Sequence, residues 1–491
     1  MLRLLCAVVA CAASAACVRN PATGNLQLNL ISESQEIELG KQAAQEVEQT
    51  IGLYKDPKLE AYVAGLGQAL SQKTNRPNLP WQFHVVEDAA VNAFALPGGP
   101  VYVTRGILGT LMTEAELAGV MGHECGHIAA RHSANQMSKA ELAQVGLGLG
   151  SVLSPELGQL SQIAGAGLQV LFLKFSRDDE SQADKLGFAY MANIGYDARQ
   201  MVEVFKTLDR VSHLAGGGKL PEWLETHPDP ENREKAAEQR LSELKVDWSK
   251  AKVNRDEYLS MIDGIVYGED PRQGYFQGSR FLHPELKFQI TFPAGWQTQN
   301  TPQAVAAISP KQDAVVELAT AGKMSPEEAA QKFFGGQQGI QRGQPAEVTV
   351  NGQRVPASYF SAQTQQGQVA GLIAFVAYNG TTYALLGYTG AQTLQQVEQI
   401  IKSFMGSFAP LTDPAALSVQ PAKIQIVRLD SDMTVEQFSQ RFPSNVKLEE
   451  LALINGFDDK NGRMQAGQRY KRVVGGPPLQ RPKVASQPPK S

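Results

Sequence analysis

Cysteine is scarce in this chain, with four residues among 491. Cys6 and Cys11 lie in an N-terminal apolar segment that has the character of a removable signal, so the mature chain keeps Cys17 and Cys125. With lipid on Cys17, as expected below, no disulfide can form, and hydrophobic cores must supply the stability. At 43% hydrophobic content there is room for two or three such cores.

A strong charge of one sign is lacking as well. The 45 basic and 49 acidic side chains give a formal charge of −4, and the basic residues form no cluster. A nucleic-acid partner is therefore not expected. The unusually apolar stretch 145–175 is interrupted by Pro155, Glu156 and several glutamines, so it is not expected to span a membrane. It is predicted to be a buried helical hairpin, with a surface for membrane or unfolded substrate as the alternative.

Residues 1–16 have the order of a secretory signal peptide. Arg3 precedes an apolar run over residues 4–13, which is too short for a transmembrane helix. Because the small residues before Cys17 resemble a bacterial lipoprotein signal, we expect cleavage there and lipid on the Cys17 sulfur and new amine. Cleavage to a soluble chain is the alternative. Val18 in place of aspartate implies the outer membrane by analogy.

The main candidate for chemistry is a H-E-x-x-H motif, His123-Glu124-Cys125-Gly126-His127. Histidines at i and i+4 share one face of an α-helix, so both imidazoles can bind one Zn²⁺, and the glutamate can act as general base on a metal-bound water. A capping box at residues 113–116 is predicted to open this helix, which is expected to run to about Met137. Cys125 points away from the ligand face and is expected to be a small core residue.

A third ligand is needed on another element, because a catalytic zinc takes three protein ligands and keeps one position open. Residues 176–184, Ser-Arg-Asp-Asp-Glu-Ser-Gln-Ala-Asp, are predicted to open a second helix. Glu180 and Asp184 share a face of it. We assign Glu180 to the metal and Asp184 to the free N–H of His123, since a carboxylate usually orients a ligating imidazole in this way. An acidic helix start that only favours the helix dipole is the alternative.

H-E-C-G-H, with E-S-Q-A-D about fifty residues later, resembles the gluzincin metallopeptidases related to the CAAX prenyl protease, HtpX and periplasmic BepA. Further stretches resemble this family, and together they cover about half of the chain. They are residues 92–99 followed by 101–104, residues 226–228 with Arg233 beyond them, and residues 20–48. The resemblance implies a mainly α, zincin-type metallopeptidase domain over residues 17–268, with a small edge-strand sheet.

Carried over residue by residue, the resemblance implies one Zn²⁺ per chain. His123, His127 and Glu180 would bind it, and Glu124 would be the catalytic base.

His227 would stabilise the tetrahedral oxyanion, with Arg233 supporting the site. The chemistry agrees, because hydrolysis builds negative charge opposite the metal. His227 could instead coordinate the open position and hold the enzyme latent, or it could be a solvated loop histidine. The remaining histidines lie off the ligand face or lack a partner pattern and are interpreted as structural: His84, His132, His213 and His283.

Residues 97–104 are predicted to form an exposed edge strand before the zinc helix. Backbone pairing with an extended peptide there would present a scissile carbonyl to the zinc with little side-chain selectivity. An ordinary hairpin strand is the alternative. The candidate substrate-binding residues are Asn92, Ala93, Phe94, Ala95, Gly98 and Gly99.

Two more folding units are expected after residue 270. Residues 275–410 combine strand-like stretches (286–292 and 369–388) with helical ones (325–334 and 394–408), which predicts a small α+β domain without a catalytic constellation. Residues 422–474 have a predicted β-α-α-β order and resemble a LysM cell-wall-binding module. Residues 431–434 lack the glycine expected at its first turn, so protein docking competes with glycan binding as its role. The tail 475–491 is predicted to be disordered.

These observations favour a zinc endopeptidase held in the periplasm, at the outer membrane, by an N-terminal lipid. Its expected substrates are misfolded or unassembled envelope proteins, and peptidoglycan is a further partner if the LysM-like module binds glycan. Two other hypotheses stay open. One is an envelope-protein assembly chaperone with latent or minor proteolysis, and the other is a cell-wall adaptor led by the C-terminal module.

Overall fold

The computed structural model describes residues 17–146, 174–214, 223, 226–227, 230–243, 246–301, 303–336, 339–364 and 367–477. The predicted signal, nearly all of the apolar stretch 145–175 and the predicted tail beyond residue 477 lie outside them. The chain divides into two compact units, Met1–Gly268 with Ala422–Ser491, and Glu269–Pro421. The C-terminal module therefore belongs to the same unit as the predicted peptidase domain and does not form a third body. No helix within the described ranges is both long and apolar enough to cross a membrane.

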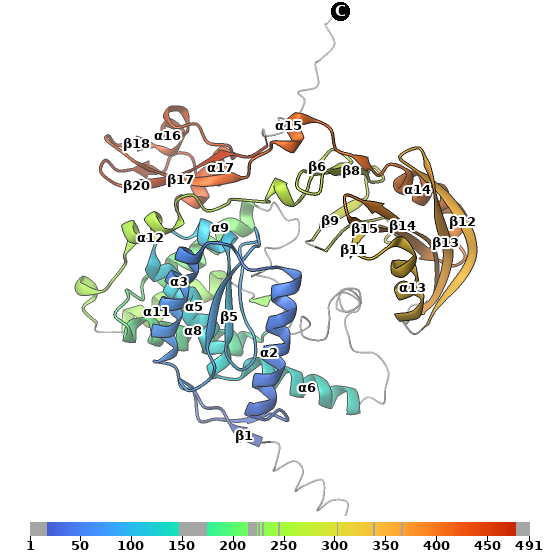
Figure 1. The fold of residues 1–491 in the computed structure, drawn as a ribbon. Helices are drawn as coiled ribbons and strands as arrows, with labels where there is room; N and C mark the ends of the chain where they lie inside the picture. The colour runs from blue at the N-terminus through green and yellow to red at the C-terminus, as the bar shows by residue number, and fades with distance from the viewer. Residues whose placement is uncertain are drawn as a thin grey trace, which may run out of the picture. The chain divides into compact units, whose positions relative to one another are not determined.

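The first unit is mainly helical, with a small sheet and an N-terminal hairpin (Figure 1). The hairpin pairs β1 (Cys17–Arg19) with β2 (Leu26–Leu28). The helices outside the C-terminal module are α2 (Glu33–Thr50), α3 (Pro57–Ser71), α4 (Arg105–Thr110), α5 (Glu114–Ala129), α6 (His132–Gly146), α8 (Arg177–Asn193), α9 (Gln200–Leu214), α11 (Pro230–Glu243) and α12 (Arg255–Ile262).

The small sheet has the order β3-β5-β4, with β3 (Gln82–Val86) parallel and β4 (Ala93–Ala95) antiparallel to β5 (Pro100–Thr104). The prediction of an exposed edge strand over residues 97–104 is therefore wrong, because β5 is the central strand. All five of its residues are buried, and an apolar run without alternation is typical of a strand covered on both faces. The edge position belongs to β4.

The helix that carries the H-E-x-x-H motif is α5, and every one of its residues is buried. The Thr113 side chain accepts a bond from the Glu116 N–H at its start, whereas the Glu116 carboxylate accepts from Met112 N rather than closing the predicted box. The predicted continuation to Met137 is wrong. Arg131 has φ 61°, and the chain turns there before α6 begins.

A close approach of α5 and α8 brings the two predicted ligand helices together, and they run side by side in Figure 1. Gly187 on α8 makes this possible, since a Cβ there would lie 2.6 Å from the backbone nitrogen of His123. A Cβ on Gly126 would likewise lie 2.9 Å from the Ala183 carbonyl oxygen. Small residues at both positions let the backbones meet.

The C-terminal module has the strand, helix, helix, strand order expected for residues 422–474. Its long strands, β17 (Ala422–Arg428) and β20 (Arg469–Gly475), pair antiparallel and flank α16 (Val435–Arg441) and α17 (Leu448–Ile454). Two shorter strands, β18 (Met433–Thr434) and β19 (Arg463–Met464), pair with each other.

Two buried residues join this module to the peptidase part of the first unit. Ile424 packs in the same core as the residues of α5. The Lys471 ammonium, which is fully buried, donates to the carbonyl oxygens of residues 109, 110 and 111 at 2.9, 3.1 and 2.6 Å, at the end of α4. The module is thus built into the unit that carries α5.

The second unit combines two antiparallel sheets with two main helices, α13 (Pro326–Gly336) and α14 (Leu394–Gly406). The smaller sheet has the order β16-β8-β7-β6 and contains Ala409–Pro410, Phe288–Thr291, Arg280–His283 and Tyr275–Gln277. The larger has the order β12-β13-β14-β15-β11-β10-β9, which is Ile340–Val350, Gln353–Thr364, Gly367–Tyr378, Thr381–Gly390, Ala314–Gly322, Ala304–Ile308 and Gln297–Asn300.

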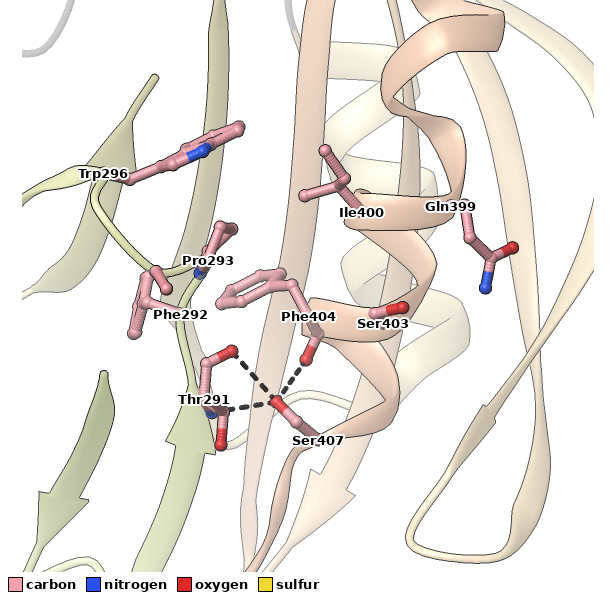
Figure 2. A pocket seen from close by; sticks show the side chains of 10 residues that line it. Thr291, Phe292, Pro293, Trp296, Gln399, Ile400, Ser403, Phe404 and Ser407 are labelled. Carbon is pink, nitrogen blue, oxygen red and sulfur yellow. Dashed lines mark hydrogen bonds between the residues drawn. The ribbon is translucent and has the colours of Figure 1, made fainter. Parts of the chain in front are cut away.

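A pocket of about 630 Å³ lies in this second unit between α14 and the segment that follows β8. Figure 2 shows Phe292, Pro293 and Trp296 opposite Ile400 and Phe404 of the helix. Its walls carry no titratable side chain.

Candidate metal centre

Four buried donors gather in the first unit: His123 and His127 from α5, Glu180 from α8, and His227. One ligand atom from each lies within 4.8 Å of the others, and none of the four residues is more than 2% exposed. The H-E-x-x-H motif and the E-S-Q-A-D segment therefore meet in space, together with the histidine from the 226–228 segment.

The spacing of the donor atoms fits a single tetrahedral metal ion. His123 Nε2 lies 3.0 Å from His127 Nε2 and 3.6 Å from Glu180 Oε2, and His127 Nε2 lies 3.5 Å from Glu180 Oε1. Ligands at ~2.1 Å from a tetrahedral zinc stand ~3.4 Å apart. Two imidazoles and a carboxylate are also a donor set that zinc prefers. These residues could hold one Zn²⁺.

Burial favours the neutral imidazoles that a metal requires. Desolvation lowers the pKa of His123, aided by the charge of Arg233, and lowers the pKa of His127 well below its usual value. Burial alone would raise the pKa of Glu180, but His227 and Arg233 outweigh it and hold that pKa below its usual range. The carboxylate is thus ionised and the two imidazoles are neutral.

Asp184 lies where the sequence assignment puts it, against the free nitrogen of His123. Its Oδ1 is 2.9 Å from His123 Nδ1. Burial by itself would raise the pKa of Asp184, but Arg233 and His123 have the larger effect and hold that pKa below its usual range. The group is therefore ionised. A carboxylate at Nδ1 keeps the proton on that nitrogen and leaves Nε2 free for the metal.

Arg233 on α11 links the two acidic residues of α8. Its Nε and Nη2 donate to Asp184 at 2.9 and 2.6 Å, and its Nη1 lies 3.0 Å from Glu180 Oε2. The guanidinium lies 4.7 Å from the ring centroids of both Phe205 and Trp223. Arg233 thus holds both carboxylates in position from a rigid, stacked geometry.

Glu124 lies beside the donors without being one of them. It is 1% exposed, and its Oε1 is 3.7 Å from His227 Nε2. Burial raises the pKa of Glu124 to about 7, against a partly opposing effect of His227. The H-E-x-x-H geometry therefore leaves this carboxylate available for proton transfer.

His227 turns its Nδ1 into the donor cluster. Nδ1 lies 2.9 Å from Glu180 Oε1 and 3.3 Å from His123 Nε2. Its ring stacks on Trp223 with centroids 4.8 Å apart, and its backbone N–H donates to the Trp223 carbonyl. The interpretation as a solvated loop histidine is wrong, since the residue is 2% exposed.

The predicted substrate-binding residues lie on and around the edge strand. Ala93, Phe94 and Ala95 form β4, and Asn92 directly precedes it. Gly98 and Gly99 both have positive φ and lie close to other backbone segments. A Cβ on Gly98 would lie 2.6 Å from the Ile37 backbone, and a Cβ on Gly99 would lie 2.6 Å from the Pro80 carbonyl oxygen. These two glycines are explained by packing.

Of the histidines interpreted as structural, three stay apart from the cluster and one does not. His84 contacts Glu60, His213 pairs with Asp209, and His283 packs on Phe288. His132 is not one of the four donors, but its Nδ1 lies 2.9 Å from His127 Nδ1, on the side away from the other donors.

The structure describes two cysteines, Cys125 and Cys17. Cys125 is fully buried in the core that packs around α5, as predicted. Cys17 is the first residue of β1, where it pairs with Leu28 in the hairpin.

Comparison with known proteins shows what the part of the chain around this centre is similar to. Residues 57–241 match the sequence model of Peptidase family M48. The chain is 32% identical over 225 residues to the "Beta-barrel assembly-enhancing protease" of Yersinia pestis, covering 44% of this chain and 46% of that protein. It is 30% identical over 236 residues to the protein of that name from Escherichia coli strain K12, covering 46% and 47%.

A third relative is the "Mitochondrial metalloendopeptidase OMA1" of Arabidopsis thaliana, 36% identical over 160 residues, or 32% of this chain and 31% of that protein. The chain spans about half the length, or less, of these curated relatives. The matched range contains His123, Glu124, His127, Glu180 and His227, and the family resemblance inferred from them is confirmed. Residues 57–241, which hold all four donors, are therefore similar to the metallopeptidases of Peptidase family M48.

Proposed function

We propose that this protein is a zinc endopeptidase of a bacterial envelope that hydrolyses peptide bonds in misfolded or unassembled envelope proteins. The observation that carries the proposal is the buried set of His123, His127 and Glu180 with Glu124 beside it. Each donor is placed by a regular helix, and Arg233 holds the carboxylates of Glu180 and Asp184. Such a rigid, water-excluding arrangement is what metal-assisted hydrolysis requires.

When bound, zinc supplies a Lewis acid and a water of lowered pKa. Glu124 would take the proton of the attacking water on its carboxylate and pass it to the leaving amide nitrogen as the carbon–nitrogen bond breaks. Asp184 would keep His123 oriented through its Nδ1–H, and Arg233 would keep Asp184 and Glu180 ionised. β4, the edge strand, would pair with an extended substrate segment.

The location and substrate class rest on two further supports. Residues 1–16 have the order of a secretory signal that ends at a lipid-accepting Cys17, which favours anchoring to the outer membrane on its periplasmic side. Two curated relatives are named as proteases that enhance β-barrel assembly. Misassembled envelope proteins are thus the substrates that we propose for the full-length protein.

The first test removes the metal. We expect the purified mature protein to contain one zinc per chain and to cleave unfolded β-casein, and dialysis against a chelator should abolish cleavage until Zn²⁺ is restored. The reason is that no other group in the cluster supplies the electrophile for an amide carbonyl. Zinc content is read by elemental analysis and cleavage on gels. A serine protease in the same buffer serves as a control, because it shows that the casein can still be cleaved there. Cleavage that persists in metal-free protein would contradict the proposal.

His227 bears on how active the enzyme is at rest. Because its Nδ1 lies among the donors, we propose that it competes for the open metal position and keeps the enzyme largely latent. His227→Ala is then expected to raise casein cleavage by roughly tenfold or more, since the competent state becomes the populated one. If His227 instead stabilises the oxyanion, the same change lowers cleavage by about 10²–10³. His213→Ala, which alters an exposed histidine paired only with Asp209, is the matched control.

The same position of His227 also supports a second candidate function, that of an assembly chaperone with latent or minor proteolysis.

For the C-terminal module, we propose docking within the chain in preference to glycan binding. Its strand β17 exchanges backbone hydrogen bonds with Gly264 and Ile265, and Arg255 donates to the Arg469 carbonyl. Through these contacts the module would stabilise the fold of the peptidase part.

A further inference from the structure

The side of His127 that faces away from the other donors contacts another histidine. Its Nε2 faces the other metal donors, and its Nδ1 lies 2.9 Å from the Nδ1 of His132. His132 is 2% exposed, and its other nitrogen, Nε2, lies 2.9 Å from Gln182 Oε1 on α8. A buried contact between two imidazole nitrogens requires that one carries a proton and donates it while the other accepts. One of the two Nδ1 atoms is therefore protonated and the other is not.

The turn at Arg131 creates this contact. On a continuous helix, a residue five positions after His127 would point about 140° away from it. Arg131 has φ 61°, and its guanidinium donates to Glu36 at 2.9 Å and to the Ile31 carbonyl at 2.7 Å. These contacts with α2 and the chain before it hold an otherwise unfavourable backbone conformation. The chain reverses there, and His132 returns to the back of the ligand ring.

The N-terminal hairpin decides which nitrogen carries the proton. Asn20 Oδ1 accepts from the backbone N–H groups of Ala22 and Thr23 at 2.8 and 3.2 Å. Its Nδ2 lies 3.2 Å from the Ala130 carbonyl oxygen, which can only accept. The amide orientation of Asn20 is therefore determined by main-chain groups on both sides. Nδ2 also lies 3.1 Å from Gln27 Oε1 and 3.1 Å from Gln182 Oε1. Gln182 presents its acceptor oxygen there, because the amide turned the other way would set two N–H donors against each other.

The rest of the chain of hydrogen bonds follows from that oxygen. Because Gln182 Oε1 accepts, the facing Nε2 of His132 must carry a proton and donate. The nearby Asp179 Oδ1, at 3.7 Å, also favours a proton on this nitrogen. A neutral His132 then has a bare Nδ1, which can only accept, and His127 must donate its Nδ1–H to it. The remaining nitrogen of His127, Nε2, is left unprotonated and points at the metal position.

We propose that His132, fixed by Gln182 and Asn20, is a positioning residue that holds His127 in the tautomer required for metal binding. The hairpin β1–β2 and the start of α6 thereby become part of the metal centre. The inference rests on the proposed function only in requiring that the cluster binds zinc. It differs from the arrangement at His123, where a charged carboxylate has the same task.

The test measures zinc affinity in the full mature protein, by competition with a chromogenic chelator. His132→Leu removes the acceptor and should weaken zinc binding by about 10–100-fold, the usual effect of losing a group that orients a ligating histidine. His132→Asn can place an acceptor Oδ1 near the same point and should keep most of the affinity. His84→Leu, which removes a histidine bonded to Glu60 away from the metal cluster, is the matched control and should leave the affinity unchanged.

Gln182 provides a second test that does not disturb the buried histidines, since its side chain is only partly buried. Gln182→Leu should weaken zinc binding a few-fold, whereas Gln182→Glu, which keeps an acceptor oxygen, should retain it. The double variant His132→Leu/Gln182→Leu should bind no more weakly than His132→Leu alone, because both changes break one chain of hydrogen bonds.

Thermal unfolding of the zinc-free variants separates positioning from simple structural support. Loss of zinc affinity in His132→Leu at an unchanged melting temperature supports the inference. Wild-type zinc affinity in folded His132→Leu, or equal affinities for Gln182→Leu and Gln182→Glu, would overturn it. A wild-type protein that binds no zinc would instead overturn the proposed function itself.

Discussion

Glu124→Gln is expected to bind one zinc per chain and to lose casein cleavage by roughly two to four orders of magnitude, the usual contribution of a general base. The amide has the shape of the carboxylate, so the buried site keeps its packing, but it cannot take up a proton. Glu124 is not one of the metal donors, which is why zinc should remain. Zinc content by elemental analysis and initial cleavage rates in the same preparation measure both halves of the expectation.

Glu116→Gln is the matched control, because Glu116 is a buried carboxylate on the same helix that accepts a bond from Met112 N. This variant should keep both zinc and cleavage. Retained cleavage by a contaminant-free Glu124→Gln protein would remove Glu124 from the mechanism. A Glu124→Gln protein that fully restores envelope integrity in a deletion strain would favour the chaperone hypothesis.

Lys471→Met is expected to lower the free energy of unfolding of the first unit by about 3 kcal/mol or more, as is usual when one partner of a buried charged arrangement is removed. The three N–H donors of the ammonium match three carbonyl oxygens at the end of α4. Methionine has similar length but no N–H donor, so those carbonyl oxygens lose their partner whether the lysine is charged or neutral, and below about pH 7 Glu116 also loses a nearby cation. Urea unfolding followed by tryptophan fluorescence measures the change.

Lys423→Met is the control for this substitution, since Lys423 is an exposed lysine on the partner strand β17. It should change the stability by no more than about 0.5 kcal/mol. The double variant Lys471→Met/Glu116→Gln should be less destabilised than the two single losses added together, because the buried charge that Lys471 leaves behind is also removed. An unfolding midpoint unchanged by Lys471→Met would show that the carbonyl contacts do not stabilise the unit.

The Lys471 effect should also depend on pH. Burial lowers the pKa of Lys471 from 10.5 to about 7, against the opposing charge of Glu116. The unfolded chain therefore holds one more proton than the folded chain between about pH 7 and 10.5. Stability rises with pH wherever the unfolded state binds more protons, so the gap in unfolding free energy between wild type and Lys471→Met should widen across that window. A gap that narrows as the pH rises would mean that folding does not lower the pKa of Lys471.

The local sequence was sufficient for the chemistry of the centre. Histidines four residues apart on a helix face the same way wherever that helix lies, so His123 and His127 could be paired from spacing alone. The same periodicity put Glu180 and Asp184 on one face of α8, where the structure has them. The strand, helix, helix, strand order of residues 422–474 was also predictable, because each element carries its own apolar pattern and turn residues.

Contacts between distant segments decided the rest. Arginine favours helix, yet Glu36, almost a hundred residues earlier, holds Arg131 in a left-handed turn, and that turn brings His132 to His127. β5 is central because β3 and β4 both pair with it, and its own apolar pattern does not say which strands its neighbours are. Lys471 is buried because the carbonyl oxygens at the end of α4 accept its three N–H donors. Helical spacing is a property of neighbouring residues, whereas strand neighbours, backbone strain and buried charge depend on partners that only the folded chain brings together.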